Sequence, residues 1–319
     1  MPQPDETIAD DYATALGALG RVAEAHFAAG RLDEALELLA HAEGIAMAPQ
    51  VRPHDRATLL IQVGEIMTAR SSFFTNEYEA TLATLRCAEQ IARATDDRLL
   101  FAHALDALGR GYYQRTLTTE QGSFDEALPC FQQALALREA AGDWSGICES
   151  MFHVGLVAER QQRYDEALAV FQTAHALAKQ HGYRSGLKDT LRHIGFNHMR
   201  AGNWAAALGC FRESLTIIEE LGLGVLLPFA QLSVGEILHI QQQWGEALEY
   251  YQLGYMQAEQ IGLRRAAMQI AYSRGELHEA QHDQAQALVW YQRAQTWAVA
   301  LGHRRGLVMC EEKLGNLAG

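Results

Sequence analysis

A five-residue stretch near the C-terminal end has the residue types of a hydrolytic metal site. The stretch His278-Glu279-Ala280-Gln281-His282 matches the pattern H-E-x-x-H, in which two histidines one helical turn apart bind Zn²⁺ and the glutamate activates a water molecule. Glu311 or Glu312, which lies downstream, would supply the third ligand. Taken alone, the motif predicts zinc-dependent peptide hydrolysis, which needs three converging ligands and a closed cavity.

The stretch of sequence that contains this motif belongs to a repeating unit. Glycines recur every 40 residues in two parallel sets, and a fixed period of this length indicates a chain built by stacking one supersecondary unit. The first set is Gly142, Gly182, Gly222, Gly262 and Gly302, and the second is Gly155, Gly195, Gly235, Gly275 and Gly315.

Each copy predicts two amphipathic helices. In residues 144–182, apolar side chains recur at steps of three and four, with a turn at Gln161 to Arg163. Glycines of the first set follow the second helix, where a left-handed residue closes it. Glycines of the second set lie inside the first helix and cost about 1 kcal/mol each, so close packing against the second helix must offset them. An alanine such as Ala167 is expected opposite, and an aromatic residue such as Phe171 is expected between neighbouring pairs.

This pattern resembles the tetratricopeptide repeat, whose first helix carries Leu-Gly and whose second carries Ala-x-x-x-Phe. Val154-Gly155 with Ala167 and Phe171 is a close match. The copies are longer than the usual length of about 34 residues, and in this they resemble repeats of bacterial regulator proteins and of the Pins/LGN and kinesin light chain adaptors. The resemblance implies an all-α, right-handed α-solenoid of about seven antiparallel helix pairs with a C-terminal capping helix.

The expected domain is a single array over residues 1–319. Its repeats are predicted at about 9–46, 55–96, 98–142, 144–182, 184–222, 224–262 and 264–302, with the cap at 304–317 and its Glu311, Glu312 and Lys313 exposed. Two early repeats carry extra residues between their helices, Arg70 to Thr75 and Arg115 to Glu120. These read as inserted turns, which either form a lip over the groove or are tolerated surface extensions.

The repeat register weakens the metal-site hypothesis. His278 stands where His198 and Leu238 stand in earlier copies, and His282 stands at the turn where Gly202 occurs. No G-x-S-x-G, P-loop or dinucleotide motif is present. We therefore expect no catalytic residue, no metal and no cofactor, and the zinc metallopeptidase stays as a third hypothesis.

The resemblance also implies which residues line a binding groove, because the first helices of tetratricopeptide arrays form the concave face. The side chains at those positions are Asp106, Arg110, Tyr113, Glu149, Phe152, Glu159, Arg160, Asp189, Arg192, Phe196, Met199, Arg200, Phe229, Glu236, His239, Tyr272, Glu276 and Glu279.

The charges of this set differ along the chain. Arg192, Phe196 and Arg200 have the spacing of one helical stripe, whereas the last repeats offer Glu236 and Glu276 with Glu279. A peptide with an acidic segment followed by a basic one would complement such a groove. Alternatively, pairs such as Asp106 with Arg110 and Asp189 with Arg192 satisfy one another on a solvated face.

One position departs from the family. The chaperone-binding subclass clamps a carboxylate with Lys and Asn, and the adaptor-like forms carry Asn directly before Leu-Gly. The residues found at the position before Leu-Gly here are Ala107, His153, His193, Ser233, Ser273 and Lys313. Neither a carboxylate clamp nor an asparagine ladder is therefore predicted.

The amino-acid composition limits the classes of binding partner that we expect. The net charge of −13 and the lack of a Lys/Arg run argue against nucleic-acid binding. No apolar run of about eighteen residues occurs, so no membrane partner is expected. Residues from Met1 to Glu6 lack signal-peptide character, and the five scattered cysteines fit reduced thiols, which together predict a cytoplasmic location.

Two leading hypotheses follow. The first is a non-catalytic interaction scaffold that binds a protein or peptide ligand, possibly of mixed charge, with self-association also open. The second is a ligand- or peptide-sensing regulatory module of a bacterial signalling or transcription system.

Overall fold

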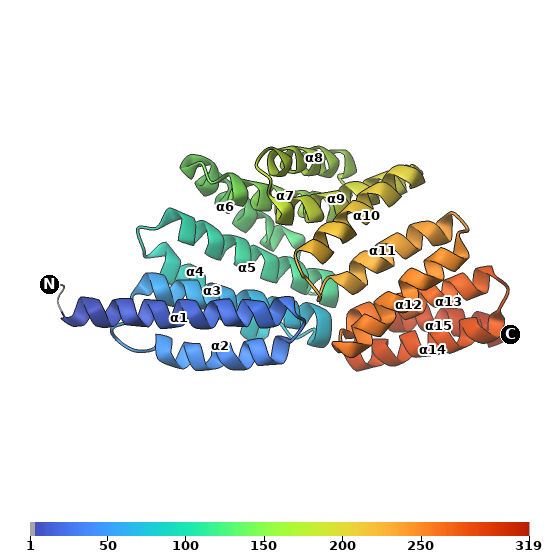
Figure 1. Cartoon of the computed structure of the whole chain (residues 1–319), viewed down its shortest axis with the longest axis horizontal. Coiled ribbons are helices and arrows are strands. Elements are labelled where there is room, and N and C mark those ends of the chain that lie inside the picture. The colour runs from blue at the N-terminus through green and yellow to red at the C-terminus, as the bar shows by residue number, and fades with distance from the viewer. Residues whose placement is uncertain (1–3, 319) are drawn as a thin grey trace. The chain divides into compact units, whose positions relative to one another are not determined.

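The computed structural model describes residues 4–318. Fifteen α-helices and two short helical turns make up the regular structure of these residues, and they contain no strand (Figure 1). The predicted all-α solenoid class is confirmed. The expectation that Met1 to Gln3 carry no signal peptide concerns residues outside the described range.

Fourteen of the helices described form seven consecutive pairs. The first four pairs are α1 (Pro4–Ala28) with α2 (Leu32–Ala46), α3 (Pro53–Arg70) with α4 (Glu79–Arg93), α5 (Arg98–Thr119) with α6 (Leu128–Ala141) and α7 (Trp144–Arg160) with α8 (Tyr164–Gln180). The last three are α9 (Arg184–Arg200) with α10 (Trp204–Glu220), α11 (Leu227–Ile240) with α12 (Trp244–Gln260) and α13 (Arg264–Ala280) with α14 (Gln284–Leu301), and α15 (Arg304–Ala318) follows alone.

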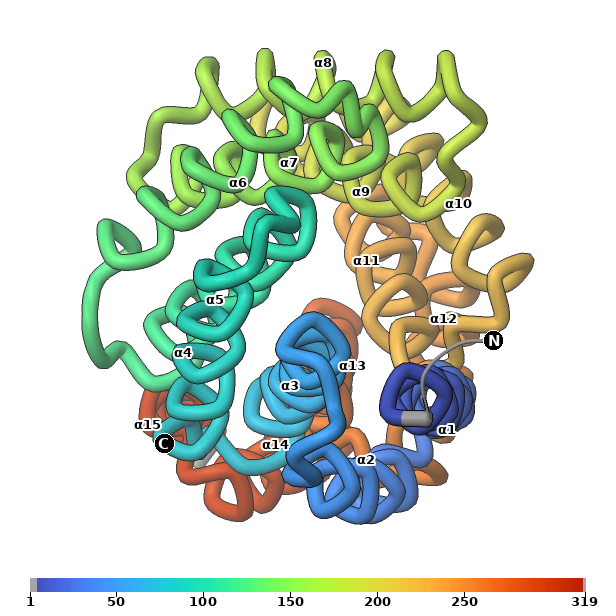
Figure 2. Tube along the Cα trace, turned by 90° about the vertical axis from the view of Figure 1, so that its left-hand side faces the viewer, coloured from blue at the N-terminus to red at the C-terminus, as the bar shows by residue number. Residues whose placement is uncertain are grey.

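The chain divides into two compact units. Unit 1 comprises Met1–Ser71 and Glu77–His181, and unit 2 comprises Ser72–Asn76 and Gly182–Gly319. Within each unit, helices that follow one another in sequence lie side by side, as α6, α7 and α8 do in unit 1 and α11 and α12 do in unit 2 (Figure 2). A single array over residues 1–319 stays a prediction.

Local sequence signals set the helix ends. The Asp143 carboxylate accepts a hydrogen bond from the Gly146 amide at 3.1 Å and so caps α7. At the other end of the pair, Gly182 has φ of 66°, and Gly222 repeats this value after α10. These left-handed glycines close the second helices, as predicted.

Glycines inside the first helices make room for an aromatic ring. A Cβ atom on Gly155 would lie 2.6 Å from Phe171, and one on Gly235 would lie 2.5 Å from Tyr251. The ring therefore packs against the glycine of its own pair. Close packing across the pair is confirmed. The Phe131 ring also stacks on His153 of the next pair, with ring centroids 4.9 Å apart, as expected of an aromatic residue between neighbouring pairs.

The two insertions are not alike. Residues Ser71–Thr75 form a π-helical turn that directly follows α3, whereas α5 runs on to Thr119, so Arg115 to Thr119 are helical and the expectation of a turn there was wrong. Ser72–Asn76 belongs to unit 2. There Arg265 donates hydrogen bonds to the Ser72 carbonyl and the Asn76 side chain, and the ring centroids of Phe73 and Phe229 are 5.3 Å apart.

Candidate binding face

The predicted groove residues differ in exposure. Asp106, Tyr113 and Glu159 are buried, and Arg160 and Arg200 are exposed. The half-buried remainder is Arg110, Glu149, Phe152, Asp189, Arg192, Phe196, Met199, Phe229, Glu236, His239, Tyr272, Glu276 and Glu279.

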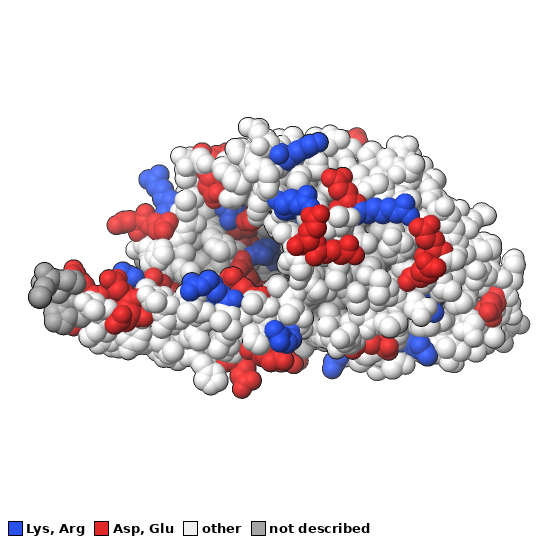
Figure 3. Space-filling view, in the orientation of Figure 1, with Lys and Arg blue, Asp and Glu red and all other residues white. Residues whose placement is uncertain are grey.

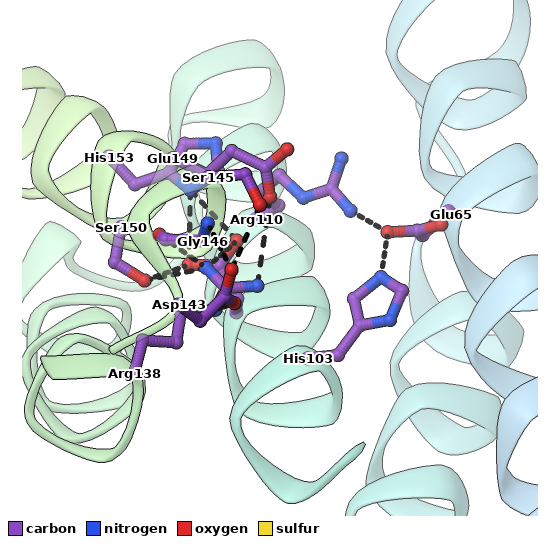
Figure 4. A network of polar contacts seen from close by, with 11 residues as sticks. Glu65, His103, Arg110, Arg138, Asp143, Ser145, Gly146, Glu149, Ser150 and His153 are labelled. Carbon is purple, nitrogen blue, oxygen red and sulfur yellow. Dashed lines mark hydrogen bonds and ion pairs between the residues drawn. The ribbon is translucent and has the colours of Figure 1, made fainter. Parts of the chain in front are cut away.

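In unit 1, Asp106 lies at the centre of a closed polar network. Its side chain is 2% exposed, and its carboxylate accepts hydrogen bonds from His153 Nδ1 at 3.1 Å and Ser150 Oγ at 3.3 Å (Figure 4). Arg138 Nη1 lies 3.7 Å away. Burial raises the pKa of Asp106, but His153 and Arg138 outweigh burial and hold this pKa far below its usual range.

Arg138 was missed by sequence reasoning, although it connects this network to α7. It donates to the Gly146 carbonyl at 3.0 Å and to Ser150 Oγ at 2.7 Å, and its Nη2 lies 3.6 Å from Glu149. The repeat contained a signal, because the equivalent positions are small or apolar. Those equivalents are Ala178, Ile218, Ala258 and Ala298.

A second part of the network engages Arg110. Glu65 on α3 accepts hydrogen bonds from Arg110 and, at 3.1 Å, from His103 Nε2 (Figure 4). Burial raises the pKa of Glu65, but the two cations outweigh it and bring the pKa to about 2. We call Glu65, His103, Asp106, Arg110, Arg138, Glu149, Ser150 and His153 together the Asp106 network.

Most of the charged groove residues predicted in unit 1 therefore pair with other side chains of this unit. The pairs differ from those expected, since Arg110 bonds Glu65 and Asp106 bonds His153. Arg160 Nε likewise donates to the Tyr113 hydroxyl at 3.1 Å. A shallow cavity in this unit, beside the end of α3 at Met67 and Ala80, contains none of the predicted groove residues.

In unit 2, Arg192, Phe196 and Arg200 follow one another at steps of four residues along α9. The Arg192 guanidinium lies 5.2 Å from the ring centroid of Phe196, which packs edge-on against Phe211 at 5.1 Å. Arg200 is exposed and donates to Asn197 Oδ1 at 3.0 Å. Asp189 accepts a hydrogen bond from Lys188 Nζ at 2.7 Å. A half-exposed aromatic ring thus lies between two arginines.

In the last repeat, two glutamates and one lysine form paired charges. Glu279 accepts hydrogen bonds from the Tyr291 hydroxyl at 2.6 Å and from Lys313 Nζ at 2.8 Å, and Glu276 lies 3.8 Å from the same Nζ. Lys313 is therefore half-buried and paired, which corrects the expectation of an exposed, solvating cap residue.

One repeat earlier, the charges are less well matched. Burial, together with the nearby Glu276, raises the pKa of Glu236 to about 7, although Arg192 lowers it. Tyr251 is fully buried, and within residues 4–318 its hydroxyl has no hydrogen-bond partner of good geometry. Ser273 lies beside both side chains. We call Arg192, Glu236, Tyr251, Ser273 and Glu276 the Glu236 cluster.

The H-E-x-x-H motif does not form a ligand pair. Helix α13 ends at Ala280, and His282 lies beyond it in the left-handed region, with φ of 62°. Glu279 is bound to Tyr291 and Lys313. Across the described part of the chain, no group of three or more His, Cys, Asp and Glu side chains has a metal-binding arrangement. These contacts do not support the metallopeptidase hypothesis.

Comparison with known families agrees with the helix pairs and the glycine–aromatic packing. Residues 116–180 match the family model described as tetratricopeptide repeat. These residues are therefore identified as tetratricopeptide repeats. A search of curated proteins finds no significant match to the chain.

Solved structures share the fold over nearly the whole chain. A Rap protein complexed with Competence and Sporulation Factor is 14% identical, with a TM-score of 0.58 and coverage of 96% of this chain and 98% of that one. A tetratricopeptide protein from Parabacteroides merdae is 14% identical, with a TM-score of 0.53 and coverage of 96% and 100%. A signal transduction ATPase with a tetratricopeptide sensor from Pyrococcus horikoshii is 13% identical, with a TM-score of 0.57 and coverage of 94% and 46%.

Acidic and basic side chains are interspersed over the face shown in Figure 3. None of the helices described has both the length and the apolar character needed to cross a membrane.

Proposed function

We propose that this tetratricopeptide chain is a non-catalytic scaffold that binds a peptide segment of a partner protein on the first-helix face of unit 2, formed by α9, α11 and α13. The observation that carries the proposal is the stripe of Arg192, Phe196 and Arg200. Aromatic and arginine side chains are enriched among residues that dominate binding energy at interfaces.

Charge selects the kind of peptide. The arginines of α9 favour an acidic segment, and Glu236 on α11 with Glu276 on α13 favours a basic one. The unit 1 residues of the predicted groove contribute less, because their charges are used within the Asp106 network. A cytoplasmic setting, expected from the scattered cysteines, is part of the proposal.

Reversing the two arginine charges tests this function. We expect the double variant Arg192→Glu with Arg200→Glu to lose capture of partner peptides from a displayed peptide library while keeping its melting temperature. The matched control is Arg212→Glu, because Arg212 is an exposed arginine of the same unit on the second helix α10. Unchanged capture by the double variant would refute the proposal.

A sensing role is the second candidate. It is favoured by the fold shared with the Rap protein, whose structure contains a bound factor, and with the ATPase whose repeats are described as a sensor. Peptide binding that changes the hydrogen exchange of helices remote from α9, α11 and α13 would distinguish sensing from simple scaffolding.

A further inference from the structure

One first-helix position of unit 2 has an arginine where other copies have an apolar side chain. The residue directly before the glycine of the repeat pattern is Val154, Ile194 and Val234 in three successive copies, and it is Arg274 in α13. Ile194 is 9% exposed and Val234 is 0% exposed. A charged side chain at an apolar packing position costs free energy unless it gains a partner, so Arg274 calls for an explanation.

The Arg274 guanidinium lies over an indole ring that a second arginine also contacts. Its Cζ is 3.6 Å from the ring centroid of Trp290, and the Cζ of Arg293 is 4.5 Å from the same centroid. Both distances are those of cation–π contacts. Burial, and then the nearby Arg293, lower the pKa of Arg274 to about 10, although Tyr255 raises it. One ring therefore holds two cations that repel each other.

Neighbouring aromatic side chains fix the position of this indole. Tyr255 on α12 packs edge-on against Trp290, with ring centroids 5.1 Å apart, and the Tyr255 hydroxyl accepts a hydrogen bond from Trp297 Nε1 at 3.2 Å. Trp290 itself is 6% exposed. Side chains of α12, α13 and α14 thus hold the ring in one place, as the support of a preorganised binding site must.

Hydrogen-bond donors around this ring lack acceptors. The Nε of Arg274 and the Nδ1 of His278, one helical turn further along α13, are enclosed and have no hydrogen-bond partner among residues 4–318. Within the same range, neither Arg274 nor Arg293 forms an ion pair with a carboxylate. Burial and then Arg274 lower the pKa of His278, although Asp283 raises it, so this imidazole is neutral near pH 7. We call Arg274, His278, Trp290 and Arg293 the Trp290 cluster.

Two carboxylates border the Trp290 cluster without pairing with its arginines. Glu259 lies beside the Tyr255 hydroxyl, and Asp283 accepts a hydrogen bond from the Gln286 amide at the start of α14. Both carboxylates are exposed, so water screens their charge. The acceptors that the two guanidinium groups lack must therefore come from water or from an anion outside the chain.

The Trp290 cluster is open to solvent and lies away from the proposed peptide face. Arg293 is exposed, and Arg274 and His278 are half-buried. Arg274 follows the groove position Tyr272 by two residues, which is about 200° around a helix of 3.6 residues per turn. An anion can therefore reach the arginines without entering the groove.

We propose that the Trp290 cluster binds a phosphate monoester, whose oxygens accept hydrogen bonds from Arg274, His278 and Arg293. Because both guanidinium groups contact one ring, their Cζ atoms are at most about 8 Å apart, and one phosphate can bridge them with hydrogen bonds of about 2.8 Å on each side. A phosphate fits better than a carboxylate, because it has three acceptor oxygens and a charge of about −2. The phosphate belongs either to a phosphorylated side chain of a partner protein or to a free phosphorylated small molecule.

Titration of the whole chain with inorganic phosphate tests the site. We expect phosphate to shift the indole N–H signal of Trp290 in ¹H–¹⁵N spectra, which sodium chloride of equal ionic strength does not do. Arg274→Val, which introduces the residue found at Val234, and Arg293→Gln should each weaken this binding at least about tenfold. The matched control is Arg264→Val, because Arg264 is an exposed arginine of the same helix. Binding by Arg274→Val as tight as that of the parent chain overturns the inference.

Thermal melting gives a second readout for the same variant. A ligand that binds only the folded chain raises its melting temperature, so phosphate should stabilise the parent chain and the Arg264→Val control more than it stabilises Arg274→Val. The comparison uses the change caused by phosphate, and so it does not depend on how stable each variant is without phosphate. Equal increases in all three chains would mean that phosphate binds elsewhere, and no increase in any of them would mean that the two arginines need no anion. Either result overturns the inference.

A phosphopeptide distinguishes the two sources of phosphate. The probe is acetyl-Gly-Gly-phosphoserine-Gly-Gly-amide, and its control has glutamate in place of phosphoserine. Tighter binding of the phosphopeptide than of inorganic phosphate supports a phosphorylated partner, whereas equal or weaker binding supports a free small molecule. A glutamate peptide that binds as tightly as the phosphopeptide overturns the choice of phosphate. These experiments do not involve Arg192 or Arg200, so the phosphate site and the proposed scaffold function can fail separately.

Discussion

The Asp106 network of unit 1 and the Glu236 cluster of unit 2 both place charged side chains of first helices against neighbouring helix pairs. In unit 1 the Glu65 and Asp106 carboxylates each meet a cation, and their pKa values fall. In unit 2 the pKa of Glu236 is raised to about 7, and among the described residues the Tyr251 hydroxyl has no hydrogen-bond partner of good geometry. Because the apolar packing is alike in both units, the difference shows that the repeat fixes the scaffold and leaves the inward polar side chains to serve either stability or binding.

The largest expected effect comes from opening the closed network. Arg138 is 4% exposed, so Arg138→Met should leave Asp106 buried with one cation fewer and cost about 3–5 kcal/mol of unfolding free energy. Urea denaturation measures this loss. The surface control Arg163→Ala, which breaks the exposed pair with Glu166, should cost less than about 1 kcal/mol. Similar losses for the two variants would mean that the network is not the stabilising element of unit 1.

The second prediction tests whether packing is equivalent in the two units. An added methyl at Gly155 in unit 1 or Gly235 in unit 2 meets a ring at 2.6 or 2.5 Å, so both alanine variants should lose about 1–3 kcal/mol through overpacking. Gly315 has the same register position in α15 but no atom within 4 Å of its Cβ direction. Gly315→Ala should therefore gain up to about 1 kcal/mol from helix propensity. Unequal losses at Gly155 and Gly235 would show that the units also differ in their cores.

The packing of the scaffold was predictable because it is local and repeated. Gly155 with Phe171 recurs every 40 residues, and glycines such as Gly182 terminate the second helices, so sequence spacing alone located nearly every helix end. The polar contacts were not predictable in the same way. Arg138 and Lys313 act on carboxylates that lie 32 and 34 residues away in sequence, and only the stacking of pairs decides which charges meet. Likewise, the sequence identified an insertion at Arg70 to Thr75 but could not assign Ser72–Asn76 to unit 2.

A third, smaller effect gives the two units opposite responses to pH. Glu236 has a raised pKa in the folded state, so its contribution to stability is full below the unfolded value of about 4.3 and is lost as pH rises to about 7. Glu65 has a lowered pKa, so its contribution is full above about 4.3 and is lost as pH falls toward about 2.

Urea denaturation at pH 5 and pH 8 tests the predicted contribution of Glu236 to the free energy of unfolding. Glu236→Gln should be more stable relative to the parent chain at pH 8 than at pH 5, whereas Glu65→Gln should be destabilised at both values. If Glu236→Gln keeps the parent's loss of stability between these pH values, then burial does not perturb this carboxyl and the contrast between the two clusters disappears.

The smallest effect concerns the turns within pairs, where the two units should behave alike. Gln162 in unit 1 and His282 in unit 2 both occupy the left-handed region, with φ of 63° and 62°, at a register position where Gly202 has φ of 76°. A non-glycine residue there costs about 1 kcal/mol, so Gln162→Gly and His282→Gly should each raise the free energy of unfolding by roughly 0.5–1 kcal/mol. Thermal melting measures the gain, and Gly202→Ala is the reverse control, with an expected loss of similar size. The variant His282→Gly also distinguishes a turn residue from a metal ligand. If His282 bound a metal ion, this variant would lose both bound zinc and stability, whereas a gain in stability equal to that of Gln162→Gly identifies His282 as a turn residue.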